Sequence, residues 1–300
     1  MVLELLRVEY SFGVDEVPRI WSALGLPGII DVHTHFMPKR VMDKVWAYFD
    51  GAGPLLGREW PVRYRTDEAE RLNTLRQFGV RRFTSLVYPH KPDMAAWLNE
   101  WAADFARSTP DCVATATFYP EPDAHRYVED AIRGGAQIFK AHIQVGDYDP
   151  NHPLLDDVWG MVDDAHLPMV IHCGSGPRPG QFTGPGPIRR LLQGHPRLKL
   201  IIAHMGMPEY REFLDIAEEF KNVRLDTTMV FMPFTEEIMP FPTDEIPRLC
   251  ALGDRILWGS DFPNIPYSYA DALYALTRLD VDDDWLRAVL YHNGAQLFSS

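Results

Sequence analysis

Short apolar runs alternate with longer amphipathic segments along most of the chain. The runs are rich in β-branched and aromatic residues, as in 28–32 (GIIDV) and 168–173 (PMVIHC), and this composition is typical of strands. We predict eight strands, at 28–32, 80–88, 112–119, 136–143, 168–173, 198–204, 222–227 and 255–260.

Between these runs, apolar residues recur three and four positions apart, which predicts helices. The predicted helices are 67–78, 94–108, 123–133, 154–165, 186–193, 209–220, 243–252 and 269–279. Strands that alternate with helices imply right-handed crossovers and a parallel sheet, and eight such units favour a closed α/β barrel of the (β/α)₈ TIM type. The alternative is an open doubly wound sheet, but the Gly-rich turn that usually follows its first strand is missing from GIIDVHTHF.

We expect a single domain over residues 1–300, with two departures from the repeat. An N-terminal extension, 1–27, contains a predicted helix at 14–24 that we expect to close the bottom of the barrel. The second departure is a long insertion after the first strand, 36–65, which is rich in aromatic residues such as Trp46. Because long loops at the C-terminal ends of barrel strands are usually functional, we expect this insertion to act as a lid.

Histidine and aspartate residues lie at the ends of several predicted strands. His33 and His35 end the first strand and, being two residues apart, point to the same face. His172 ends the fifth strand, His204 ends the sixth, and Asp261 follows the eighth. A lone histidine at a strand end is more often structural, so the prediction rests on the whole set at the rim where barrel active sites occur. Three of these imidazoles and the carboxylate suit Zn²⁺, with His204 beside the metal, and Mn²⁺ or another transition metal is also possible.

The sequences around these residues resemble a known family. DVHTHF follows the first strand, VIHCG the fifth, IIAHMG the sixth and ILWGSDFP the eighth. Together they resemble the amidohydrolase superfamily. More narrowly, they resemble the amidohydrolase-related branch that includes aminocarboxymuconate semialdehyde decarboxylase. The resemblance extends from Gly28 to Phe298 and includes the HNGAQLF tail.

The resemblance implies a metal-dependent barrel domain with one divalent metal ion. The residues that match the family's metal ligands are His33, His35, His172 and Asp261. His204 matches a histidine that serves in catalysis in the mononuclear decarboxylases and binds a second metal in binuclear hydrolases. The same branch also contains homodimers, which makes a homodimer an expectation by analogy alone.

Five further residues are candidates for substrate binding. Lys140 lies where binuclear members carry a carboxylated lysine, but a Lys-X-His pair on the fourth strand is common in this branch with one metal. We therefore expect Lys140 and His142 to line the pocket, together with Tyr88, Ser175 and Arg178.

Two reactions fit these residues, and a third interpretation needs no reaction. In the leading hypothesis, water activated by the metal attacks a lactone or amide carbonyl of a small organic acid. Asp261 then accepts a proton, and His204 stabilises the developing oxyanion or relays a proton. The alternative is a lyase that removes CO₂ from a small aromatic or muconate-type carboxylic acid. The third is a catalytically silent barrel that serves as a scaffold, for which a missing ligand would be the usual sign.

The charge and composition of the chain limit the kinds of binding partner that we expect. The formal net charge is −13, which argues against nucleic acid or an anionic membrane surface as a partner and leaves a small-molecule substrate. The three cysteines are too few and too scattered for a disulfide framework. The first residues lack the long apolar core of a signal peptide, so we expect a cytoplasmic protein.

Overall fold

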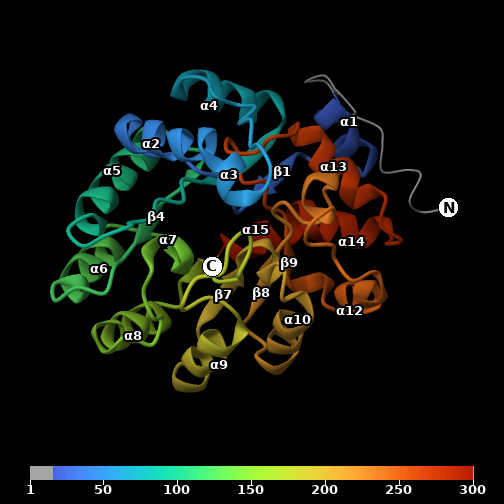
Figure 1. Ribbon diagram of the computed structural model, residues 1–300. Coiled ribbons are helices and arrows are strands. Elements are labelled where there is room, and N and C mark those ends of the chain that lie inside the picture. Colours follow the sequence, from blue (N-terminus) through green and yellow to red (C-terminus); the bar gives the residue numbers. More distant parts are fainter. Residues whose placement is uncertain (1–15, 300) are drawn as a thin grey trace.

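The computed structural model describes residues 16–299, which form a parallel α/β barrel surrounded by helices (Figure 1). All eight predicted strands are present. They are β1 (Ile29–Asp31), β2 (Val80–Thr84), β3 (Cys112–Val113) with β4 (Thr115–Thr117), β5 (Ile138–His142), β6 (Pro168–His172), β7 (Lys199–Ile202), β8 (Arg224–Asp226) and β9 (Ile256–Leu257). β3 and β4 together occupy the third predicted strand and are separated only by Ala114. The predicted TIM barrel is therefore confirmed.

Neighbouring strands pair in parallel, in the order β1–β2–β3 and β4 to β9. The last strand meets the first, because Val32 N donates to Trp258 O at 3.0 Å and Thr34 forms a parallel bridge with Phe262. The interruption between β3 and β4 is bridged by Ala114 O, which accepts from the backbone N–H groups of two residues at the start of β5. The ring of strands is thus closed on both sides.

Helices follow the strands and cover the outside of the barrel (Figure 1). The helices are α1 (Glu16–Ala23), α2 (Lys39–Asp50), α3 (Ala52–Leu56), α4 (Glu68–Gln77), α5 (Ala95–Ser108), α6 (Ala124–Arg133), α7 (Ile143–Gly146), α8 (Asp156–Asp164), α9 (Pro185–Gly194), α10 (Tyr210–Glu219), α11 (Pro233–Glu236), α12 (Ile246–Ala251), α13 (Tyr269–Thr277), α14 (Asp283–Arg287) and α15 (Asn293–Leu297). α2 and α3 belong to the insertion after β1. Among residues 16–299, no helix has the length and apolar character needed to cross a bilayer.

The C-terminal tail, rather than the N-terminal helix, closes the bottom of the barrel. Leu297 and Phe298 pack into the apolar cluster of inward-facing strand residues that includes Ile30 and Ile138. Figure 1 accordingly shows α15 at the centre of the ring. α1 packs instead against α13 on the outside. Residues 14 and 15 of the predicted N-terminal helix lie outside the described residues.

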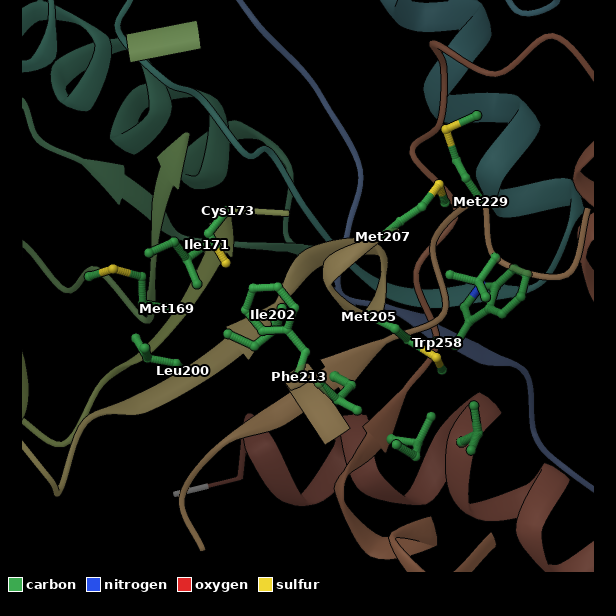
Figure 2. Close-up of a cluster of buried hydrophobic side chains, with 14 of the residues drawn as sticks. Met169, Ile171, Cys173, Leu200, Ile202, Met205, Met207, Phe213, Met229 and Trp258 are labelled. Carbon is green, nitrogen blue, oxygen red and sulfur yellow. The ribbon is translucent and has the colours of Figure 1, made fainter. Parts of the chain in front are cut away.

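A second apolar layer fills the space between strands and helices. Figure 2 shows Met169 and Ile171 from β6 beside Leu200 and Ile202 from β7, with Phe213 from α10 in the same cluster. Because both faces of these strands are buried, they appear in the sequence as continuous apolar runs. This packed layer fixes the strands in place. It therefore also fixes the C-terminal ends of the strands, which lie at the rim opposite the barrel bottom.

Candidate metal centre

Two histidines and one aspartate meet at the C-terminal rim. His33 and His35 follow β1, and Asp261 follows β9, which is the neighbour of β1 in the closed barrel. One ligand atom from each of the three residues lies within 4.8 Å of the others. His35 Nε2 lies 2.9 Å from Asp261 Oδ1, and His33 Nε2 lies 3.7 Å from the same oxygen.

The opposite ring nitrogens of both histidines are held by acceptors. His33 Nδ1 lies 2.9 Å from Asp226 Oδ2, and His35 Nδ1 lies 2.8 Å from Leu86 O. A carbonyl or carboxylate oxygen can only accept, so each Nδ1 carries a hydrogen, and in the neutral ring each Nε2 presents a lone pair. Burial also lowers the pKa of His33 well below its usual range, with the charge of Lys140 acting in the same direction, so this ring is neutral.

These tautomers make the cluster a good fit for a metal ion. Two imidazole lone pairs and the Asp261 carboxylate face one another at distances where three acceptors repel unless a cation lies between them. Histidines that bind metals characteristically donate their other N–H to a carboxylate or a backbone carbonyl, as His33 and His35 do here. Burial by itself would raise the pKa of Asp261, but a hydrogen bond from His35 Nε2 and positive charge on the neighbouring imidazoles hold it at about 2, so the carboxylate is ionised. A metal ion bound to His35 Nε2 would take the place of that hydrogen.

Asp226 is a residue of this site that the sequence did not lead us to expect. It ends β8 and is fully buried. Besides contacting His33, its carboxylate accepts hydrogen bonds from His204 N at 2.8 Å and from Thr228 N at 3.1 Å. The signal was present in the sequence, because this aspartate ends the seventh predicted strand as His172 ends the fifth.

Asp31 is a second buried carboxylate beneath the cluster. Its Oδ1 accepts from His33 N at 3.1 Å and from Ser260 N at 3.2 Å, and its Oδ2 accepts from the Tyr269 hydroxyl at 2.8 Å. Burial raises the pKa of Asp31 to about 7, although these hydrogen bonds favour the ionised form. This carboxylate joins the strand that carries His33 to the segment that carries Asp261.

His204 lies beside the cluster in a tight turn after β7. Its ring centroid is 5.1 Å from that of His33, and its Nδ1 lies 3.1 Å from Thr228 O, so its Nε2 carries the lone pair. Its φ is +55°, and the turn ends at Gly206, where an added Cβ would lie 1.9 Å from the Phe213 ring. Burial lowers the pKa of His204, although the charges of Asp261 and Asp226 oppose this effect.

His172, the fourth predicted ligand, lies next to this group without joining the three-residue cluster. Its ring centroid is 4.7 Å from that of His204, and its Nε2 lies 3.2 Å from Gly176 O. It also stacks on His142, with centroids 4.1 Å apart and planes 12° from parallel. The ring therefore borders the centre and presents Nδ1, rather than Nε2, as its lone pair.

The predicted substrate residues divide into two groups. His142 and Tyr88 have ring centroids 4.7 Å apart, and Tyr88 is 5.6 Å from His35, so both border the centre. Burial raises the pKa of Tyr88 above its usual range, which keeps the phenol neutral. Lys140 belongs to the same group: it is fully buried, and its Nζ has no hydrogen-bond partner among residues 16–299. Burial lowers the pKa of Lys140 to about 8, against the attraction of Asp226 and Asp261.

Ser175 and Arg178 form the second group, on the loop that joins β6 to α9. Ser175 N donates to Glu209 Oε2 at 3.0 Å, and its hydroxyl lies 3.3 Å from Thr183 Oγ1. Arg178 is exposed, and its backbone carbonyl accepts a hydrogen bond from the Gln144 side chain. Ser175 is thus bonded to Thr183 in its own loop and to Glu209 at the start of α10, whereas Arg178 faces solvent.

A parallel barrel with this rim cluster defines a class of metal-dependent barrel enzymes. The chain matches the amidohydrolase family over residues 30–299 and therefore belongs to that family. No curated protein sequence matches the chain.

Several solved structures share the fold. An uncharacterized TIM-barrel protein from Bordetella bronchiseptica has a TM-score of 0.73 and 18% identity, covering 91% of this chain and 98% of its own. Dihydroxybenzoic acid decarboxylase from Polaromonas sp. JS666, with bound manganese and the inhibitor 2-nitroresorcinol, has a TM-score of 0.65 and 18% identity, covering 91% of this chain and 97% of its own. A probable 2-pyrone-4,6-dicarboxylic acid hydrolase from Acinetobacter baumannii has a TM-score of 0.62 and 14% identity, covering 91% of this chain and 100% of its own.

Proposed function

We propose that the protein is a metal-dependent hydrolase that opens a lactone or amide bond in a small organic acid. The observation that carries the proposal is the convergence of two imidazole lone pairs and an ionised carboxylate on one point at the barrel rim. His33, His35 and Asp261 would hold one divalent ion, Zn²⁺ or Mn²⁺, with His172 as the neighbouring fourth ligand. When bound, such an ion lowers the pKa of water toward neutrality and polarises a carbonyl oxygen.

The protein's own groups supply the proton transfers. Asp261 is ionised, so its carboxylate would accept a proton from the attacking water. His204 is neutral and donates its Nδ1 hydrogen to Thr228, which leaves Nε2 to accept a proton and pass it to the leaving group. Of the two roles considered for His204, this tautomer favours the proton relay over oxyanion stabilisation.

Cationic and neutral donors next to the centre favour an anionic substrate. Lys140 contributes a buried ammonium group that has no hydrogen-bond partner in the part of the chain that the structure describes. His142 Nδ1 accepts from Val145 N at 3.3 Å, so its Nε2–H is the group left to donate. These donors suit a carboxylate on the substrate, with Tyr88 as a neutral phenol beside them. Ser175 and Arg178 would contact only a substrate that extends as far as the loop after β6.

A second candidate function is decarboxylation of a small aromatic or muconate-type acid. It is favoured by the likeness to a manganese-containing dihydroxybenzoic acid decarboxylase. The same donors, Lys140 and His142, would then hold the carboxylate that leaves as CO₂, and His204 would exchange a proton with the reacting carbon.

One experiment separates the two reactions. Purified protein loaded with Zn²⁺ or Mn²⁺ is incubated in H₂¹⁸O with panels of lactones, amides and aromatic acids, and the products are analysed by mass spectrometry. Hydrolysis incorporates one ¹⁸O atom into the product acid, whereas decarboxylation releases CO₂ and leaves the ring closed. CO₂ release without ¹⁸O incorporation would refute the hydrolase proposal in favour of the lyase. Unchanged turnover in His33→Ala and His35→Ala would refute both.

A further inference from the structure

The insertion after β1 is attached to the segment that carries Asp261. Trp46, on α2, donates its indole N–H to Asn264 Oδ1 at 3.1 Å, and Trp60, after α3, donates to Asn264 O at 2.7 Å. Each tryptophan is 8% exposed and Asn264 is 2% exposed, so both bonds lie in the interior. A third bond attaches the insertion to the next residue of the same segment, because Arg63 N donates to Ile265 O at 2.9 Å.

Asn264 in turn closes the turn that begins at Asp261. Asn264 N donates to Asp261 O at 2.9 Å, and Asp261 N donates to His33 O at 2.8 Å. Asp261 has a φ of +68°, a left-handed conformation that costs a residue with a Cβ about 1 kcal/mol. The turn is held at one end by the bond from Asp261 N to His33 O, at the other by the bond from Asn264 N to Asp261 O, and between them by the bond from His35 N to Phe262 O at 2.7 Å.

Trp46 is itself fixed by several groups around its ring. The guanidinium of Arg71 lies 5.2 Å from the ring centroid and that of Arg65 lies 5.5 Å from it, which are cation–π distances. The side chain belongs to an apolar cluster with Met37 and Met42. The indole N–H therefore approaches Asn264 from a side chain that is already immobilised.

We propose that Asn264 is a positioning residue through which the insertion holds Asp261 in place to bind metal. The insertion is then a structural part of the metal centre rather than the mobile lid that its length suggests. The inference rests on the proposed metal centre, and it adds a dependence that the ligands alone do not imply. Metal affinity is set in part by two indole N–H groups that never touch the ion.

Two effects follow. Loss of a partner that orients a ligand typically lowers metal affinity about 10- to 100-fold, and we expect losses in this range when Asn264 is removed. By linkage, metal binding must also favour the state in which the insertion is attached. Hydrogen exchange of backbone amides in residues 39–60 should therefore slow when metal is added.

The test compares five proteins: wild type, Trp46→Phe, Asn264→Ala, the double variant of these two, and the control Trp159→Phe. Trp159 is 1% exposed and donates its indole N–H to Pro150 O at 2.8 Å, so its variant loses a buried bond of the same kind away from Asp261. Mn²⁺ affinity is measured by titration calorimetry, and folding is checked by circular dichroism. Hydrogen exchange of the wild type is measured with and without Mn²⁺.

We expect affinity to fall about 10-fold in both Trp46→Phe and Asn264→Ala, with less than about a 2-fold change in the control. The double variant should bind no more weakly than either single variant, because both changes remove the same bond. Equal affinity in all five proteins, or an equal loss in the control, would overturn the positioning role while leaving the metal centre intact. A wild type that binds neither Mn²⁺ nor Zn²⁺ would instead overturn the metal centre and the proposed function together. Should Asn264→Ala fail to fold, Trp60→Phe tests the second bond to the same residue.

Discussion

Replacing Lys140 with methionine should make the protein more stable and less active. The lysine is fully buried inside the barrel, and its Nζ has no hydrogen-bond partner among residues 16–299. Methionine has a similar length and no charge, so it fills the same space without an unpaired ammonium group. The variant isolates the cost of keeping that charge inside the barrel.

The magnitude follows from the pKa of Lys140. Burial lowers that pKa from 10.5 to about 8, and the difference corresponds to roughly 3 kcal/mol of lost folding stability. The unfolded chain keeps its proton up to about pH 10.5, whereas the folded protein keeps it only up to about pH 8. The full cost is therefore present below pH 8, decreases between pH 8 and 10.5, and disappears above that range.

The assay is urea denaturation of metal-free wild type and Lys140→Met at pH 7 and at pH 10, with exposed Lys221→Met as the control. We expect the variant to gain roughly 3 kcal/mol in free energy of unfolding at pH 7 and distinctly less at pH 10, with no such pattern in the control. A change of the same size at both pH values would refute the reasoning, because only a desolvated ammonium produces the dependence. In the same variant, substrate KM should rise, since Lys140 is proposed to hold the substrate carboxylate.

Three further predictions concern the metal centre. Asp226→Asn removes the charge that orients His33 and should weaken Mn²⁺ binding about 10- to 100-fold in calorimetry; undiminished affinity would contradict an orienting role. In Gly259→Ala, the new Cβ would lie 2.2 Å from Thr228 Oγ1 and 2.7 Å from His33 Cβ, so we expect a loss of about 1–3 kcal/mol in urea denaturation and impaired metal binding. Gly194→Ala has open space and should show neither effect. Chelation of the metal should lower the thermal unfolding midpoint, because saturating metal at about 100 times Kd adds about 3 kcal/mol; an unchanged midpoint would argue against a bound ion.

The fold was largely predictable from the sequence because the apolar pattern repeats eight times. Strands buried on both faces leave continuous apolar runs, and amphipathic helices leave a period of three to four residues. The break in the third strand at Ala114 was not predictable, since the residues on either side are equally suited to a strand. Nor was the role of Leu297 and Phe298 at the barrel bottom, which depends on where the tail packs rather than on its own pattern.

The site was predictable where the signal is local. His33 and His35 share a face because they are two residues apart, and this spacing can be recognised without the fold. Asp226 and Asn264 act on residues far away in the chain. Asp226 contacts His33 across 193 positions and Asn264 contacts Trp46 across 218 positions. A short polar residue after a strand looks the same in the sequence whether it orients a ligand or caps a turn.

The tautomers of the histidines are a further part of the site that could not be predicted from the sequence, and they determine what the site can bind. A sequence places imidazoles at a rim, but it does not say which nitrogen faces inward. Here Leu86 O fixes the choice for His35, and the Asp226 carboxylate fixes it for His33. Both choices direct lone pairs at Asp261, an arrangement of three acceptors that is repulsive in itself. Barrel folding therefore creates a site with a deficit of positive charge at its centre, while the buried cation of Lys140 beside it has no hydrogen-bond partner within the described part of the chain. Under the proposed function, a divalent ion would relieve the first imbalance and an anionic substrate the second, and both features favour an enzyme over an inert scaffold.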